Sequence, residues 1–260
     1  MQSSVFAKWT LEHPFKSHVV LPGIISLLLI GMYFSGNAYL QNIVAPSLED
    51  VPAFMAREFG ALEILQNFLL VWISFYSVRC FMAAGDLRVK LFSFFLIIVG
   101  VFTLLEEVDY GTPFVEYFTG HYGSLAPETW QRNWHNRIGS SGVQNVSYLK
   151  LAASIAIPLG FVLAPLLLAG SRNPTLRLLV PSRWVIGTVI AMVLLSRLAH
   201  GLDDAGYSII GGTEGILHKN ISEFRELNMY FLLLLYTATL HERIIVRQNS
   251  PKNVNHKTAA

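Results

Sequence analysis

The chain has 260 residues, of which 53% are hydrophobic and only 14% are charged, and its formal net charge is +2. This composition lies outside the usual range of soluble domains and is typical of membrane proteins. The small net charge and the lack of a basic stripe interleaved with aromatic residues argue against nucleic acid as a partner. A single cysteine, Cys80, excludes an internal disulfide framework and a cysteine-based zinc site.

Six mostly apolar stretches of about 20 residues, the length that crosses a bilayer, are predicted to be membrane-spanning helices. They cover residues 19–40, 61–83, 90–110, 149–170, 183–201 and 222–245. Their number and length predict an all-α fold, a polytopic transmembrane helix bundle that forms one domain over residues 1–246. A polar cytoplasmic tail is expected at 247–260. The first stretch is too long for a signal-peptide core, so we interpret it as an uncleaved anchor.

The basic residues predict the orientation of the bundle. Of the 19 lysine and arginine residues, 12 lie before the first span, in or beside the two even-numbered loops, or at and after the end of the last span, whereas 14 of the 17 acidic residues lie on or near the other side. Since cytoplasmic segments carry the excess of Lys and Arg, both termini are expected in the cytoplasm. The location expected from this pattern is the bacterial cytoplasmic (inner) membrane, with membrane lipids as neighbours.

Three connecting segments lie on the outer side in this topology. Residues 41–60 contain a stretch, from Pro46 to Gly60, that is predicted to form an amphipathic interfacial helix. Residues 111–148 form the longest outer loop, and residues 202–221 form a glycine-rich one. Three prolines lie inside two of the spans, where neighbouring helices can satisfy the carbonyl groups that a proline leaves free: Pro22, Pro158 and Pro165.

Ionisable side chains gather at the outer ends of four predicted spans. Such groups are costly inside a bilayer and usually face the bundle interior or a cavity, so a bundle could bring these four ends together. The ionisable residues, with the polar residues beside them, are Glu58, Glu63, Gln66 and Asn67 at the start of the second span, Glu106, Glu107 and Asp109 at the end of the third, Arg197, His200 and Asp204 at the end of the fifth, and Glu223, Glu226 and Tyr230 at the start of the sixth.

Carboxylates and histidines in one place have three physical interpretations. They can bind a divalent metal, which activates water or polarises a carbonyl group. They can instead share protons, or pair with arginines of adjacent helices while the outermost acids are solvated. For the first interpretation the candidate metal ligands are Glu106, Glu107, Asp109, His135, His200, Glu223 and Glu226, and the candidate catalytic residues are Glu106, Glu107 and His135.

The sequence from Leu105 to Gly111, followed by Asn133-Trp134-His135-Asn136, resembles a group of uncharacterised bacterial polytopic membrane proteins. Members of that group carry a Glu-Glu pair and an aromatic-Gly step at a helix end, and an Asn-x-His-Asn-like element one loop later. The Glu-rich start of the last helix, Glu223 to Asn228, fits the same pattern. The resemblance implies that the Glu-Glu pair, His135 and the Glu223/Glu226 pair form one constellation. It implies no particular activity.

Three functions are compatible with these features. The leading hypothesis is an integral membrane protein with an outward-facing acidic and histidine site that depends on a divalent cation and acts on a lipid or lipid-linked substrate. The first alternative is a non-catalytic subunit of a larger membrane complex, whose apolar helices contact other membrane subunits. The second is a small proton- or cation-coupled transporter. Whether the protein is an enzyme stays open at this point.

Overall fold

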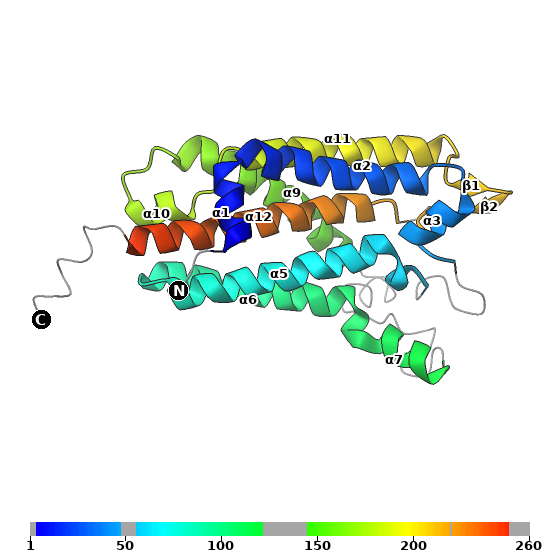
Figure 1. Cartoon of the computed structure of the whole chain (residues 1–260), viewed down its shortest axis with the longest axis horizontal. Helices are drawn as coiled ribbons and strands as arrows, with labels where there is room; N and C mark the ends of the chain where they lie inside the picture. The colour runs from blue at the N-terminus through cyan, green and yellow to red at the C-terminus, as the bar shows by residue number, and fades with distance from the viewer. Residues whose placement is uncertain (1–3, 48–55, 122–144, 219, 250–260) are drawn as a thin grey trace, which may run out of the picture.

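The computed structural model is a bundle of helices arranged roughly side by side (Figure 1). It describes residues 4–47, 56–121, 145–218 and 220–249. Apart from one hairpin of two-residue strands, every regular element in those ranges is a helix, which confirms the prediction of an all-α polytopic bundle. The predicted interfacial helix between Pro46 and Gly60 falls largely outside the described residues.

The long helices are α2 (Leu21–Tyr33), α5 (Ala61–Ala83), α6 (Leu87–Glu107), α9 (Asn145–Leu168), α11 (Val185–Asp204) and α12 (Glu223–Gln248). The shorter elements are α1 (Val5–Glu12), a π-helical turn (Lys16–Val20), α3 (Ala38–Val44), two 3₁₀ turns (Arg57–Phe59 and Asp109–Gly111), α7 (Thr112–Thr119), α10 (Pro174–Leu179), β1 (Ile209–Ile210) and β2 (Thr213–Glu214). The two strands pair antiparallel, with Ile209 opposite Glu214.

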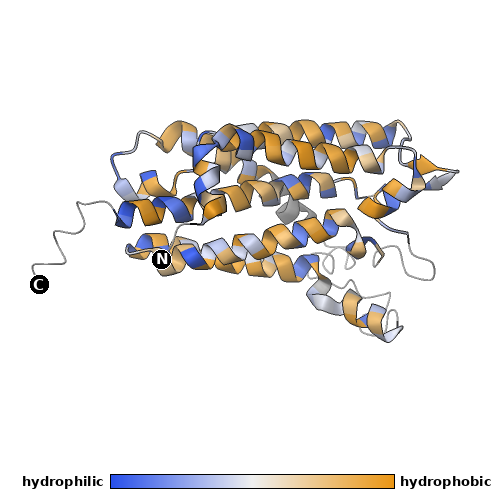
Figure 2. Ribbon diagram, in the orientation of Figure 1, coloured by the Kyte–Doolittle hydropathy of each residue, from blue (hydrophilic) through white to orange (hydrophobic). Residues whose placement is uncertain are grey.

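Five helices of the described chain are long and apolar enough to cross a membrane, as an integral membrane protein requires. They are Lys16–Tyr33, Ala61–Ala83, Leu87–Glu107, Val185–Asp204 and Glu223–Gln248. The hydrophobic colour in Figure 2 extends along all of them. The predicted span 149–170 falls on α9 (Asn145–Leu168), and the part of this helix from Ile157 to Leu168 is apolar among the described residues.

The first spanning helix ends at Tyr33, several residues before the predicted limit of 40. Gly36 has a φ of +74°, a left-handed conformation that stops a helix and that glycine adopts without strain. Asn37 then caps the next helix, because its side chain accepts hydrogen bonds from the backbone N–H groups of Tyr39 and Leu40. The sequence after Tyr33 therefore starts a separate short helix, α3.

Helix α12 lies at the centre of the bundle and contacts α5, α11, α1 and α2. Of the 18-residue apolar segment of α12, 78% of the residues are buried inside the bundle. The corresponding segment of α6, the most apolar of the five spans, has 28% of its residues buried. The central helix nevertheless carries many polar residues, among them Glu223, Glu226, Asn228 and His241, all of them buried. The bundle thus places its polar helix inside and its apolar helices outside, toward lipid.

Hydrogen bonds attach the first spanning helix, Lys16–Tyr33, to α11 and α12. Pro22 has no N–H to donate to the carbonyl group of His18 four residues earlier, and that carbonyl accepts a hydrogen bond from the hydroxyl group of Thr188 in α11. This confirms for Pro22 that a neighbouring helix satisfies the freed carbonyl. Farther along, the Asn228 amide nitrogen of α12 donates to Ser26 Oγ at 2.9 Å.

The acidic end of the bundle is closed by a polar contact between α2, α3 and the segment around the hairpin. The backbone N–H of Leu217 donates to Tyr33 Oη at 3.0 Å, and Gln41 Nε2 donates to the carbonyl oxygen of Ser208 at 2.9 Å. Gly215 passes so close that a β-carbon there would lie 2.4 Å from Tyr33 Oη. This contact holds the connection between α11 and α12, and therefore the start of α12, against the bundle.

Replacing Gly60 by alanine should destabilise the protein. Gly60 precedes α5 directly, and a β-carbon there would lie 2.2 Å from the backbone carbonyl oxygen of Val44, which cannot move without α3. Overpacking of this kind costs about 1–3 kcal/mol. Thermal unfolding of the purified protein in detergent measures the change as a lower Tm. Gly31→Ala is the matched control, because a β-carbon at that position meets no atom within 4 Å; equal Tm values for the two variants would contradict the prediction.

Candidate carboxylate centre

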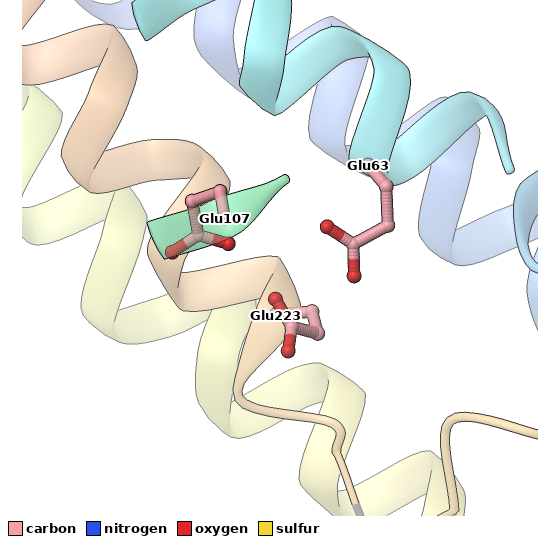
Figure 3. Close-up of side chains that lie close together, drawn as sticks. All are labelled: Glu63, Glu107 and Glu223. Carbon is pink, nitrogen blue, oxygen red and sulfur yellow. The ribbon is translucent and has the colours of Figure 1, made fainter. Parts of the chain in front are cut away.

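Three glutamate side chains from three helices meet near the acidic end of the bundle. Glu63 comes from α5, Glu107 from α6 and Glu223 from α12, and each offers one carboxylate oxygen within 4.8 Å of the others. Figure 3 shows the three carboxylates directed toward a common space. Glu63 and Glu223 are buried and Glu107 is half-buried. We call these three residues the carboxylate centre.

The helix dipoles act differently on the three acids, because two lie at helix N-termini and one lies at a helix C-terminus. Glu63 and Glu223 lie in the first turns of α5 and α12, where the helix dipole favours a negative charge. Glu107 is the last residue of α6, where the dipole disfavours one. The Tyr230 hydroxyl of α12 donates to Glu107 Oε1 at 2.7 Å and so offsets part of this cost.

Arg57 supplies positive charge beside the centre from the 3₁₀ turn before α5. Its Nε lies 3.5 Å from Glu58 Oε1 and 3.9 Å from Glu63 Oε1, and its Nη1 lies 3.9 Å from Glu223 Oε1. Burial disfavours the charged guanidinium, but the surrounding carboxylates, Glu223 and Glu63 foremost, outweigh it and raise the pKa of Arg57. Arg57 therefore stays charged and reduces the repulsion among the acids.

Gln66, one turn after Glu63, lies against the centre from the interior. Its Nε2 donates to the backbone carbonyl oxygen of Glu223 at 2.9 Å and lies 3.4 Å from Glu223 Oε2. The side chain is fully buried, and its carbonyl oxygen Oε1 has no hydrogen-bond partner in the described part of the chain. A buried acceptor without a partner costs about 1–3 kcal/mol, which a bound ligand or water would recover.

The structure brings only part of the predicted constellation together. Glu107 and Glu223 belong to the carboxylate centre, and Glu226 is buried one turn farther along α12. Glu106 is buried as well, but its carboxylate accepts a hydrogen bond from the Tyr110 hydroxyl and is not part of the three-oxygen group. His200 is exposed on α11.

Two members of the predicted set, His135 and the side chain of Asp109, lie outside the described residues. Conversely, the predicted ligand set omits Glu63, which belongs to the centre and shares a helix end with Glu58. It also omits Arg57, which lies beside the centre. The Arg57-Glu58 pair directly before an apolar span was the available signal for Arg57, and the position of Glu63 in the first turn of that span was the signal for Glu63.

A separate polar contact surrounds His218 near the hairpin. Its Nδ1 lies 3.2 Å from Asp203 Oδ2 of α11, and its Nε2 lies 3.8 Å from Glu214 Oε2. Glu214 is exposed, so this contact is open to solvent. It holds the connection between α11 and α12 and does not extend to the carboxylate centre.

No protein-family model matches the chain, and neither the curated proteins nor the solved structures contain a match. The fold and the composition of its helices define the class of the protein, which is a polytopic helix bundle that fits an integral membrane protein.

Removal of the Arg57 charge should destabilise the bundle, because the buried carboxylates would then repel one another without it. Arg57→Gln is expected to cost of order 3 kcal/mol, the scale for breaking a buried ion pair. Adding Glu63→Gln should recover part of that loss, since one negative charge is removed as well. Unfolding in detergent of the wild type, both single variants and the double variant measures this coupling.

The control is Lys8→Gln, which removes one member of the exposed Lys8–Glu12 pair and should change stability by no more than about 0.5 kcal/mol. Strictly additive effects of Arg57→Gln and Glu63→Gln would show that the two side chains do not interact and would contradict the electrostatic account.

Proposed function

We propose that this integral membrane protein binds a divalent cation at the carboxylate centre. The observation that carries the proposal is the approach of one oxygen each from Glu63, Glu107 and Glu223 to within 4.8 Å of one another. Two oxygens bound to one Ca²⁺ at about 2.4 Å lie at most about 4.8 Å apart, so the three carboxylates fit around such an ion with little movement. Oxygen-only ligands favour Ca²⁺, Mg²⁺ or Mn²⁺ over Zn²⁺ or copper.

Gln66 supports the same proposal independently of the acids. Its carbonyl oxygen is a fully buried acceptor without a partner among the described residues, beside a cluster of carboxylates. Side-chain amide oxygens are common ligands of Ca²⁺. The amide nitrogen of the same residue donates to the backbone carbonyl oxygen of Glu223, which holds the amide group beside the centre.

A cation held by three carboxylates keeps open positions for a substrate or water. It would polarise a carbonyl or phosphoryl oxygen there, while the Arg57 guanidinium beside it would hold an anionic group. Because the centre lies at the ends of membrane-spanning helices, the substrates that can reach it include lipids and lipid-linked molecules. This proposal combines cation binding with action on such a substrate.

Mn²⁺ binding tests the proposal on the purified full chain. The wild type should bind Mn²⁺ saturably, with one ion per chain, as measured by the loss of the free-ion signal in electron paramagnetic resonance. Glu63→Gln and Glu223→Gln should each weaken binding at least about tenfold, because each removes a charged ligand worth 1.4 kcal/mol or more. Glu214→Gln, at an exposed position of the hairpin, should leave the affinity unchanged.

Size-exclusion profiles of the same samples separate loss of binding from loss of fold. A wild-type protein that shows no saturable Mn²⁺ binding would refute the proposal. So would folded Glu63→Gln and Glu223→Gln variants that bind Mn²⁺ like the wild type.

We further propose that the carboxylate centre lies on the outer side of a bacterial inner membrane, with both termini in the cytoplasm. The support is the distribution of basic residues, together with the position of α1 and the end of α12 at the same end of the bundle (Figure 1). In a Cys80→Ser background, Tyr207→Cys should react with a membrane-impermeant maleimide in intact cells. Arg247→Cys should react only after the cells are permeabilised; the reverse pattern would show the opposite orientation.

A further inference from the structure

A hollow opens in the half of the bundle opposite the carboxylate centre. It has a volume of about 460 Å³ and lies between α6, α9, α10 and α12. Its walls include Phe92 and Phe95 of α6, Gly160 and Phe161 of α9, and Tyr236 of α12. Phe95 is 58% exposed, which shows that the hollow is open along the α6 side rather than sealed.

The lining of the hollow is almost wholly apolar. Among the described residues that line it, Tyr236 is the one with a polar side-chain group, and the Tyr236 hydroxyl donates to the carbonyl oxygen of Leu179 at 2.7 Å. The rings of Phe92 and Phe161 meet the Tyr236 ring edge-on, with centroids 6.2 and 5.2 Å away. An apolar space of this kind gives water no hydrogen-bond partners, so hydrocarbon is the occupant that the lining favours.

Arg243 contacts one end of the hollow, and two further arginines lie close to that end in sequence. Val180 and Pro181 form its wall there, and Arg243 Nη1 donates to the carbonyl oxygen of Val180 at 2.6 Å. Arg177 and Arg183 flank the same stretch in sequence and are exposed. A guanidinium has five N–H donors and pairs well with phosphate, so this rim is complementary to an anionic headgroup.

We infer that the hollow between α6 and α9 binds an anionic phospholipid, with an acyl chain along the apolar walls and the phosphate at the rim formed by Arg177, Arg183 and Arg243. The apolar acyl chain matches the apolar walls, and the anionic phosphate matches the adjoining arginines. The lipid belongs to the leaflet at the basic end of the bundle. This site is distinct from the carboxylate centre, since Val99 on its α6 wall and Glu107 are eight residues apart, about 12 Å along the helix.

A substitution inside the hollow tests the acyl-chain part of the site. A β-carbon at Gly160 meets no atom within 4 Å, so Gly160→Phe can place a ring in the hollow without disturbing the backbone. Gly31→Phe is the matched control, because Gly31 lies on the exposed surface of α2 and a β-carbon there also meets no atom within 4 Å. The full chain is reconstituted with equal amounts of phosphatidylglycerol and phosphatidylcholine, extracted in mild detergent and examined by native mass spectrometry.

The wild type and Gly31→Phe should retain phosphatidylglycerol, and Gly160→Phe should lose it. Arg177→Gln combined with Arg183→Gln should abolish the preference for phosphatidylglycerol over phosphatidylcholine. Equal lipid retention by Gly160→Phe and the wild type would overturn the proposal. A wild type without a preference for phosphatidylglycerol would refute the headgroup contact, and a protein dimer that Gly160→Phe disrupts would show that a second chain, not a lipid, fills the hollow.

Discussion

The cost of placing charged groups at membrane depth governs how this bundle is arranged. Helix α12 contains acids at its start and a histidine and an acid near its end, and it would be a poor helix to expose to lipid. The bundle buries it on most sides, and the more apolar helices surround it. Glu63 of α5 and Glu107 of α6 lie beside Glu223 of α12, and the guanidinium of Arg57 next to them reduces the repulsion among the three acids. The carboxylate centre follows from that burial.

The helical architecture could be predicted from the sequence because a bilayer leaves backbone groups few ways to be satisfied. Apolar stretches of sufficient length in this setting become helices almost irrespective of side-chain detail. The limits of the elements depend on local chemistry, and there the prediction was weaker. The first span was extended to residue 40 because the apolar pattern continues past Tyr33, whereas the left-handed Gly36 and the capping side chain of Asn37 divide it into two helices.

The candidate site was harder to predict, because sequence gives the helix end of a residue but not the direction of its side chain. Glu106 and Glu107 are adjacent and project about 100° apart, so only one of them could face α12. The structure selects Glu107, which Tyr230 holds, and directs Glu106 toward Tyr110. His200 lies at the appropriate end of α11 but on its exposed face. Glu63 lay at a helix end already recognised as acidic, and its inward direction could be found only from the packing of α5 on α12.

The hydrogen bond from Thr188 to the carbonyl group released by Pro22 has a mechanical consequence for the whole bundle. It fastens α2 to α11, and Asn228 fastens α2 to α12 through Ser26, so one side of the bundle is joined by directional polar bonds. On the opposite side, α6 and α9 are separated by an apolar hollow. Non-directional contacts slide more easily than hydrogen bonds, so α6 and α9 can shift against each other more easily than α2 can shift against α11 and α12. Lateral strain imposed by the bilayer would be taken up between α6 and α9 first.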